Sequence, residues 1–447
     1  MSKKRVKKIQ DFDRLYWLLR YYVDAILKLS YRSIIYVGTE NIPKDGAIIY
    51  APNHANALMD ALVVLAMDRK PKVFVARADI FKNPRLAKIF TFLKIMPIMR
   101  LRDGFNEVRK NHETISKAVD VLRDKIPFCI FPEGTHLAKY SSLPLSKGIF
   151  RIAFQAQEMM PDMPLYIVPT GIRYGNFFRF RSALRVQIGT PIHVGNFIAE
   201  HADLTPPEQM NLMKDLLTER IHSSIFYIPD DQDYNAVCEI CYVMHPLEVK
   251  ELLKDKSLGK QHNLELLFQA NNNTLKAIAD LKEHDPETAQ RLLKLGDEAH
   301  ALRQELKISR ESVSNRQGVV ARILKGVFFV ATLPYSIAAS VLTLPVIAVC
   351  KYLFTLLKDP AFKNSVWYLG YLLLWPLLVI IYSIIAALLL PWQWMLLFVL
   401  LAIPSPIVAH EFWYTMRIAI SEIRLRRANR LMGLYAQIKE IINKKEC

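Results

Sequence analysis

The sequence predicts an α/β domain joined to a helical region and to a membrane region. Short β-branched and apolar runs alternate with helical patterns over residues 31–200. Residues 201–322 carry strong helix signals and few strand candidates. Residues 323–412 hold long apolar stretches, so the 52% hydrophobic content is concentrated toward the C-terminal third. One globular domain does not account for this chain.

Seven strands are expected in the α/β domain, because seven short apolar runs are bounded by turn residues. They lie at residues 33–38, 47–51, 72–76, 95–99, 127–131, 165–172 and 184–188. The helical patterns between them predict helices packed on a sheet.

The first 30 residues combine a basic run with an apolar helical stripe. Asp11, Asp13 and Asp24 interrupt the apolar stretch, so we do not interpret it as a signal peptide. Residues 12–29 are instead expected to form an amphipathic helix on an anionic membrane surface. A helix packed on the domain's own core is the alternative.

Helix signals dominate residues 201–322. Thr205 and Glu208 have the spacing of a capping box, with Pro206 at the first helical position. Two apolar-periodic runs, 263–283 and 286–307, meet at Asp285 and predict an antiparallel helical hairpin.

Three apolar stretches follow, and the first two reach the roughly 20 residues that a bilayer crossing needs. Residues 366–390 and 394–409 predict a hairpin, because a short uncharged turn joins them and basic residues flank both ends. The positive-inside rule places those ends, and a basic helix over 413–447, on the cytoplasmic side. Residues 327–350 then form a re-entrant or broken helix, with Pro334 and Pro345 as places to bend.

The net charge of +17 fits an anionic lipid surface, because basic residues flank the apolar segments. No nucleic-acid-binding motif interleaves them with stacking aromatic residues, so no nucleic-acid partner is expected. Five cysteines give no disulfide framework. Cys238 and Cys241 have half of a zinc spacing without a second ligand pair, so we expect no metal and interpret them as one helical face.

The candidate catalytic residues are His54 and Asp60. A neutral imidazole held by a carboxylate suits removal of a proton from an alcohol, which is a poor nucleophile at neutral pH. Five residues separate the two, and positions six apart on a regular helix do not share a face. A turn or bulge between Ala55 and Met59 is therefore needed to bring them together.

Other candidates follow neighbouring predicted strands. Asn53 and His54 come after 47–51, Arg100 follows 95–99, and Glu133 follows 127–131. Ligands bind at that edge in open α/β sheets, so these residues are expected to converge.

These residues resemble the glycerophospholipid acyltransferase family, over residues 30–195. Asn53-His54 through Asp60 is similar to the family's first block, and the resemblance implies the branch with the longer spacing, which includes glycerol-3-phosphate acyltransferases. Phe131-Pro132-Glu133-Gly134-Thr135 is similar to the third block, although His136 stands where arginine is usual. A mixed sheet flanked by helices is the implied fold.

The resemblance also implies which residues bind substrate. Arg100 ends the similar second block and would contact the acceptor phosphate, with Arg102 as a rival. Lys147 is one of the basic residues that could replace the arginine lost at position 136. The remaining implied substrate-binding residues are Asn53, Glu133, Gly134 and Thr135.

The expected activity is transfer of a fatty acyl group to glycerol-3-phosphate or lysophosphatidate at the cytoplasmic face of a membrane. The donor is acyl-CoA or acyl-carrier protein, and no other cofactor is required. Two alternatives stay open: a catalytically inactive membrane-anchored interaction protein, and a lipid thioesterase in which water replaces the alcohol. The sequence makes no prediction of oligomeric state.

Overall fold

The computed structural model describes residues 8–98, 115–254, 262–314 and 319–443. The chain forms two compact units. The first comprises Met1–Tyr227 with Leu357–Tyr368, and the second comprises Ile228–Leu356 with Leu369–Cys447. A short segment late in the sequence therefore belongs to the first unit.

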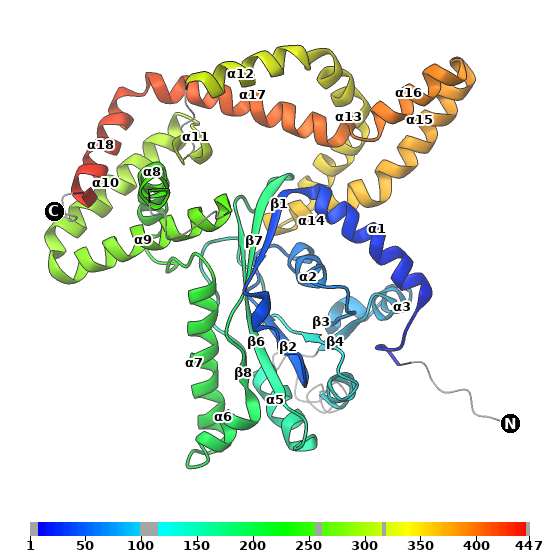
Figure 1. Ribbon diagram of the computed structural model, residues 1–447, viewed down its shortest axis with the longest axis vertical. Helices are drawn as coiled ribbons and strands as arrows, with labels where there is room; N and C mark the ends of the chain where they lie inside the picture. The colour runs from blue at the N-terminus through cyan, green and yellow to red at the C-terminus, as the bar shows by residue number, and fades with distance from the viewer. Residues whose placement is uncertain (1–7, 99–114, 255–261, 315–318, 444–447) are drawn as a thin grey trace. The chain divides into compact units, whose positions relative to one another are not determined.

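The first unit is built on one mixed sheet of eight strands (Figure 1). Its order is β1-β7-β6-β2-β5-β3-β4, with β8 beside β6. β6 is antiparallel to β7 and β8, and the other neighbouring pairs are parallel. The strands are β1 (Tyr31–Val37), β2 (Ala47–Pro52), β3 (Val73–Arg77), β4 (Ile95–Ile98), β5 (Phe128–Cys129), β6 (Leu165–Tyr174), β7 (Ser182–Ile188) and β8 (Ile192–His193). All seven predicted strands are confirmed, and β8 is additional.

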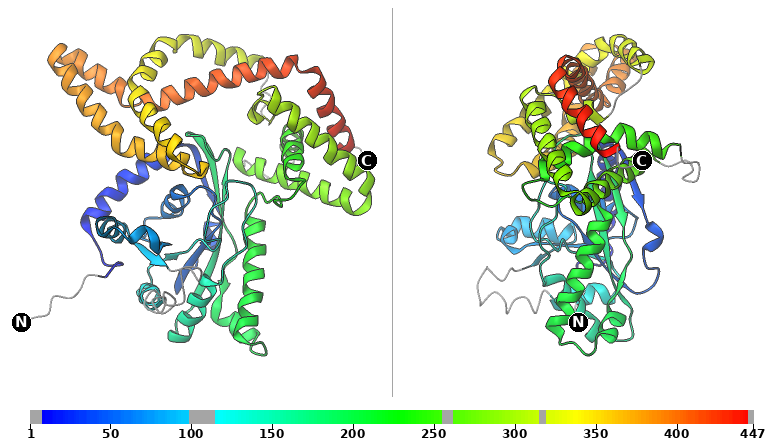
Figure 2. Two further views of the ribbon diagram at one scale, coloured as in Figure 1. Left: turned by 180° about the vertical axis from the view of Figure 1, so that it is seen from behind. Right: turned by 90° about the vertical axis from the view of Figure 1, so that its left-hand side faces the viewer.

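Helices cover both faces of the sheet. Figures 1 and 2 show α7 on one face, with α2 and α3 on the opposite face. β2 lies between these layers, and all six of its residues are buried, as expected of a central strand. The helices are α1 (Arg14–Ser30), α2 (Leu58–Leu65), α3 (Pro84–Phe92), α5 (Gly148–Met159), α6 (Val194–Glu200) and α7 (Pro206–Ser224).

The first unit extends past the expected boundary at residue 200, because α7 packs on the sheet. Met213, Leu217 and Ile221 recur every four residues on α7 and are buried in the core beside the strands. A Cβ on Gly171 of β6 would lie 2.4 Å from the Ser224 carbonyl oxygen, so the helix end and the strand are in close contact. The capping box at Thr205 and Glu208 is present.

One face of α1 is buried and another face exposes apolar side chains. Tyr16, Arg20, Asp24 and Leu27 are buried. The exposed set consists of Leu15, Leu18, Leu19, Tyr21, Tyr22 and Leu29. The helix thus packs on its own domain and also presents an apolar surface, whose contact with a membrane stays a prediction.

The helical region of the second unit contains the two helices expected around Asp285. That residue lies between α9 (Asn263–His284) and α10 (Pro286–Glu305), and its side chain accepts from the Thr288 amide. Cys238 and Cys241 are both buried on α8 (Tyr234–Leu252). The remaining helices are α11 (Arg310–Ser314) and α18 (Asn429–Asn443).

Apolar helices make up the rest of the second unit. They are α12 (Val319–Ala331), α13 (Leu333–Leu356), α15 (Trp375–Leu389), α16 (Trp392–Ala402) and α17 (Ser405–Arg427). The helix α14 (Lys363–Leu369) belongs, up to Tyr368, to the first unit. Two helices of the described chain, Leu333–Leu356 and Pro360–Leu389, are long and apolar enough to cross a membrane. The bent pair α16 and α17 makes a third if it is one span. The protein is a membrane protein.

The helix break expected within 327–350 lies at one of its two candidate positions. The chain breaks at Thr332, beside Pro334, whereas α13 continues through Pro345 for 24 residues. α15 and α16 pack on each other and meet at Pro391, where the hairpin turn was expected. The second helical segment of the hairpin was expected to end at residue 409, but α17 continues to Arg427. The re-entrant path and the side of the membrane stay predictions.

Candidate active site

The turn between β2 and α2 brings His54 and Asp60 together. Ala57 has a φ of 47°, a backbone conformation that non-glycine residues seldom adopt. The backbone amides of Ala55 and Asn56 donate to Asp60 Oδ2 over 2.8 and 2.7 Å. The chain thus wraps around the carboxylate, and this turn replaces the helical spacing that would separate the two residues.

The His54 ring contacts Asp60 directly, at 2.8 Å between Nδ1 and Oδ2. Asp60 is fully buried, and its Oδ1 accepts from the Tyr174 hydroxyl at 2.6 Å. Four donors therefore converge on one carboxylate, which fixes its position and favours the ring tautomer with the proton on Nδ1. His54 Nε2 is left as the proton acceptor, on a side chain that is 17% exposed.

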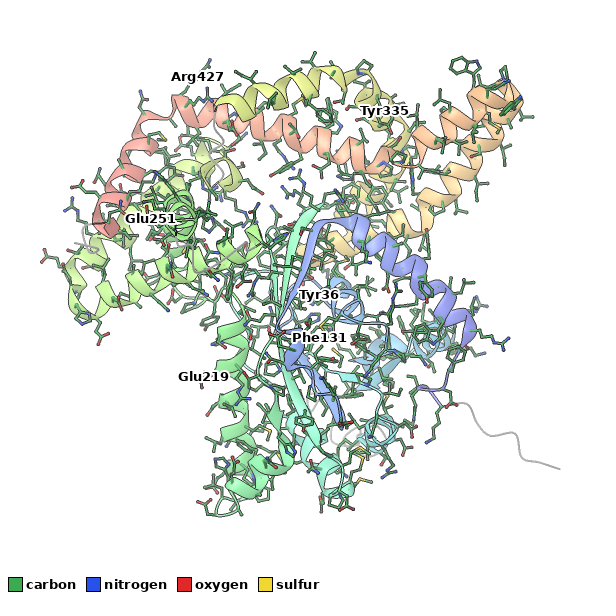
Figure 3. The ribbon with its side chains drawn as sticks, in the orientation of Figure 1. Tyr36, Phe131, Glu219, Glu251, Tyr335 and Arg427 are labelled. Atoms are coloured by element: carbon green, nitrogen blue, oxygen red, sulfur yellow. The ribbon has the colours of Figure 1, made fainter. Side chains whose placement is uncertain are left out.

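Aromatic residues surround the His54 ring. Phe131, labelled in Figure 3, stacks on it at 4.2 Å between ring centroids and 23° between planes. His136 approaches edge-on, with centroids 5.4 Å apart. These contacts restrain rotation of the imidazole that the hydrogen bond to Asp60 orients.

Glu133 holds two loops of the site in place. Its Oε1 accepts from the His54 backbone amide at 3.0 Å, and its Oε2 accepts from the Leu143 amide at 3.1 Å. Burial raises the pKa of Glu133 to about 8, and the two amide hydrogen bonds oppose that shift. The structure gives Glu133 a positioning role, and its contact with the acceptor stays a prediction.

Replacing Glu133 by glutamine should change how stability depends on pH. A carboxyl whose pKa is higher in the folded protein favours folding when protonated, so its stabilisation is lost as the pH rises from about 4.5 through about 8. The melting temperature of the wild type relative to Glu133→Gln should therefore fall between pH 5 and pH 8.5. A constant difference across that range would contradict the raised pKa.

Asn53 connects the His54 loop to β6. Its side-chain nitrogen donates to the Ile172 carbonyl at 3.1 Å, and its side-chain oxygen accepts from the Ile172 amide at 2.6 Å. Pro52 lies opposite Thr170 in the parallel register of β2 and β6, which brings the two strand ends level. Asn53 thus has a structural role that the sequence did not predict, and its contact with substrate stays a prediction.

The remaining predicted residues lie around the loop after β5. Gly134 has a φ of 66° and open space where a Cβ would be, and Thr135 is exposed. Lys147 is exposed just before α5, and the adjacent Ser146 amide donates to the Pro132 carbonyl at 2.8 Å. The start of α5 therefore lies beside the Glu133 loop. Arg100 and Arg102 lie outside the described residues.

Tyr174 is a site residue that sequence reasoning missed. It ends β6 and is fully buried, and burial raises its pKa well above the usual value, so the hydroxyl stays a donor to Asp60. In the sequence, only its position at the end of the strand that contains Pro169 indicates that Tyr174 lies near the site. The register of β6 against β2 is needed to show that its hydroxyl reaches Asp60. No cluster of three or more residues able to hold a metal occurs in the described parts of the chain.

Replacing Tyr174 by phenylalanine is expected to lower stability more than activity. The change removes one donor to a buried charge, at about 1.5–3 kcal/mol, while the other contacts still hold Asp60. Tyr36→Phe is a matched control, because its hydroxyl donates to the neutral Val63 carbonyl at 3.1 Å and should cost about 0.5–1.5 kcal/mol. Denaturant unfolding measures both, and equal costs would contradict a charged acceptor at Asp60.

Comparison with known proteins finds a family model and relatives that are all described as acyltransferases. Residues 33–173 match a family model described as Acyltransferase. Glycerol-3-phosphate O-acyltransferase 2 of Saccharomyces cerevisiae is 26% identical over 262 residues, which are 58% of this chain and 34% of the yeast protein. A 1-acyl-sn-glycerol-3-phosphate acyltransferase of Borreliella burgdorferi is 27% identical over 175 residues, 38% of this chain and 65% of that protein.

A probable 1-acyl-sn-glycerol-3-phosphate acyltransferase of Mycoplasma pneumoniae is 24% identical over 188 residues, 39% of this chain and 67% of that protein. The matched parts thus span from about a third to about two thirds of these relatives. Residues 33–173 of this chain form an acyltransferase domain that belongs to the glycerophospholipid acyltransferase family.

Proposed function

We propose that this protein transfers a fatty acyl group from acyl-CoA or acyl-carrier protein to a hydroxyl of glycerol-3-phosphate or lysophosphatidate. The observation that supports this most strongly is the contact between His54 and the buried, fourfold hydrogen-bonded Asp60. The names of the relatives from yeast and bacteria support both acceptors.

The reaction follows from this arrangement. The acceptor hydroxyl gives its proton to His54 Nε2 while its oxygen attacks the thioester carbonyl carbon. Asp60 stabilises the positive imidazole that results. The tetrahedral intermediate then collapses, the carbon–sulfur bond breaks, and the thiolate takes the proton from His54. The products are an ester and a free thiol, and no acyl-enzyme is formed.

Basic residues are proposed to hold the acceptor phosphate. Lys147 stands beside the Glu133 loop as a point charge. Arg100 or Arg102 would add the planar fork that makes two charge-assisted hydrogen bonds to phosphate. Gly134 leaves room for close approach of a ligand, because nothing lies where its side chain would be.

The catalytic domain is proposed to work at the cytoplasmic face of its membrane. The apolar face of α1 would lie on the lipid, and the basic residues around the apolar helices would face the cytoplasm. A protease site added after the basic C-terminal helix, which is expected on the same side as the catalytic domain, tests this orientation. If protease cleaved the protein in sealed vesicles only from the side opposite to the cytoplasm, the proposed orientation would be contradicted.

An acyl-transfer assay tests the proposed activity. Membranes holding the wild type or His54→Ala are given labelled acyl-CoA or acyl-carrier protein, with glycerol-3-phosphate and lysophosphatidate in parallel. The proposal expects an ester product that depends on one of these acceptors and on His54. Free fatty acid in place of ester would identify a thioesterase, and no turnover of any donor would favour an interaction protein.

A further inference from the structure

The segment Leu357–Tyr368, here called the connector, follows α13, includes most of α14 and is part of the compact unit that holds the active site. Ala361 and Tyr368 are buried. The Tyr368 hydroxyl donates to the Val23 carbonyl at 3.0 Å, and the Asn364 side chain donates to the Phe177 carbonyl at 2.6 Å. The connector is therefore docked on the catalytic domain by contacts at its C-terminal half.

Asp359, in the N-terminal half of the connector, contacts the active site itself. Its Oδ2 lies 2.7 Å from His136 Nε2. Its Oδ1 accepts from the Ala361 amide at 2.9 Å, which caps the short turn Pro360–Phe362. Phe362 of that turn lies edge-on to the His136 ring at 5.1 Å between centroids. The connector therefore fixes His136 with one hydrogen bond and one ring contact.

His136 in turn contacts the base. Its ring meets His54 at 79°, edge against face, while Phe131 stacks on His54. A series of contacts thus runs from Asp359 through His136 to the imidazole that takes the proton. Displacement of a reacting group by about 1 Å can cost as much as 10²-fold in rate, so restraint of this ring has a kinetic effect.

We propose that Asp359 and His136 are positioning residues for His54, and that the connector thereby completes the active site from between two apolar helices. The inference rests on the proposed acyl transfer. It also gives a role to His136, which stands where the resemblance implies arginine: the side chain bridges the connector and the base.

The competing explanation is that Asp359 only docks the connector on the domain. The exposure of its side chain distinguishes docking from positioning of His54. The Asp359 side chain is 46% exposed and the His136 side chain 15%, so water screens their contact and it adds little to stability. Tyr368, Asn364 and Ala361 hold the connector without it. Loss of the Asp359 carboxylate should therefore leave the fold intact and act on rate.

Steady-state kinetics of Asp359→Asn, in the full-length protein in membranes, test the proposal. An asparagine oxygen can still cap the Ala361 amide, so only the carboxylate contact to His136 is lost. We expect kcat to fall by about 10-fold, the acceptor KM to stay within about twofold, and the melting temperature to stay unchanged. Lys358→Ala, which removes an exposed neighbouring side chain, is the control and should match the wild type.

A double-mutant cycle completes the test. If Asp359 acts through His136, the variant carrying both Asp359→Asn and His136→Ala should be no slower than His136→Ala alone. Additive losses would overturn the proposal, as would a change in acceptor KM without a change in kcat, or an Asp359→Asn variant as fast as Lys358→Ala. An inactive wild type would instead overturn the proposed function on which the inference rests.

Discussion

Replacing His54 by alanine is expected to lower kcat for acyl transfer by about 10²- to 10⁴-fold, because an alanine side chain cannot take the hydroxyl proton. The fold should survive, since Asp60 keeps its bonds from Tyr174, Ala55 and Asn56. Thermal unfolding and acyl-transfer kinetics on the same preparation separate the two effects.

The control for this change is another histidine outside the site. His284 is exposed at the end of α9, and His284→Ala should leave kcat at the wild-type value. If His54→Ala retained more than about a tenth of the wild-type kcat, general-base catalysis by His54 would be refuted.

Changing Asp60 to asparagine is expected to lower kcat by about 10³- to 10⁴-fold, because an amide does not stabilise a positive imidazole and can favour the wrong ring tautomer. Stability should also fall, by about 1–3 kcal/mol, since the amide nitrogen would face donors that now meet a carboxylate oxygen. His54→Ala removes one donor to the carboxylate but puts no amide nitrogen against the remaining donors. The two variants should therefore share a kinetic loss, with the larger fall in melting temperature for Asp60→Asn.

Tyr174→Phe distinguishes the roles of Asp60. If the Asp60 carboxylate had only a structural role, Asp60→Asn and Tyr174→Phe would both lower stability, and the two variants would have similar kcat values. An Asp60→Asn variant as active as Tyr174→Phe would therefore remove Asp60 from the catalytic pair.

The sheet could be predicted from sequence because each of its longer strands is an apolar, β-branched run between turn residues. β8 could not, because Ile192 and His193 alone give no period. The boundary after residue 200 was misplaced because α7 and the helices after it show the same helical period. The sheet-facing stripe Met213, Leu217 and Ile221 shows its packing partner only in the structure.

The candidate site divides in the same way. The approach of His54 to Asp60 followed from the chemistry that the pair would perform, and the structure confirms the contact. The sequence also required a turn between Ala55 and Met59, and the structure contains it, but the residue at which the backbone turns did not follow, because an alanine with positive φ at position 57 leaves no sign in the sequence. Tyr174 and Asp359 are separated from their partners by 114 and 223 residues, so strand register and chain path determine those contacts.

The discontinuous first unit has a consequence for biosynthesis. During translation the β-strands leave the ribosome long before the connector, which follows α13 in the chain. Domains generally fold from the N-terminus as they are made, so the sheet can form before the connector that contains Asp359 has been synthesised. The site therefore gains its full complement of side chains only after the first long apolar helix, α13, has been synthesised, so the proposed activity is expected to wait for that helix.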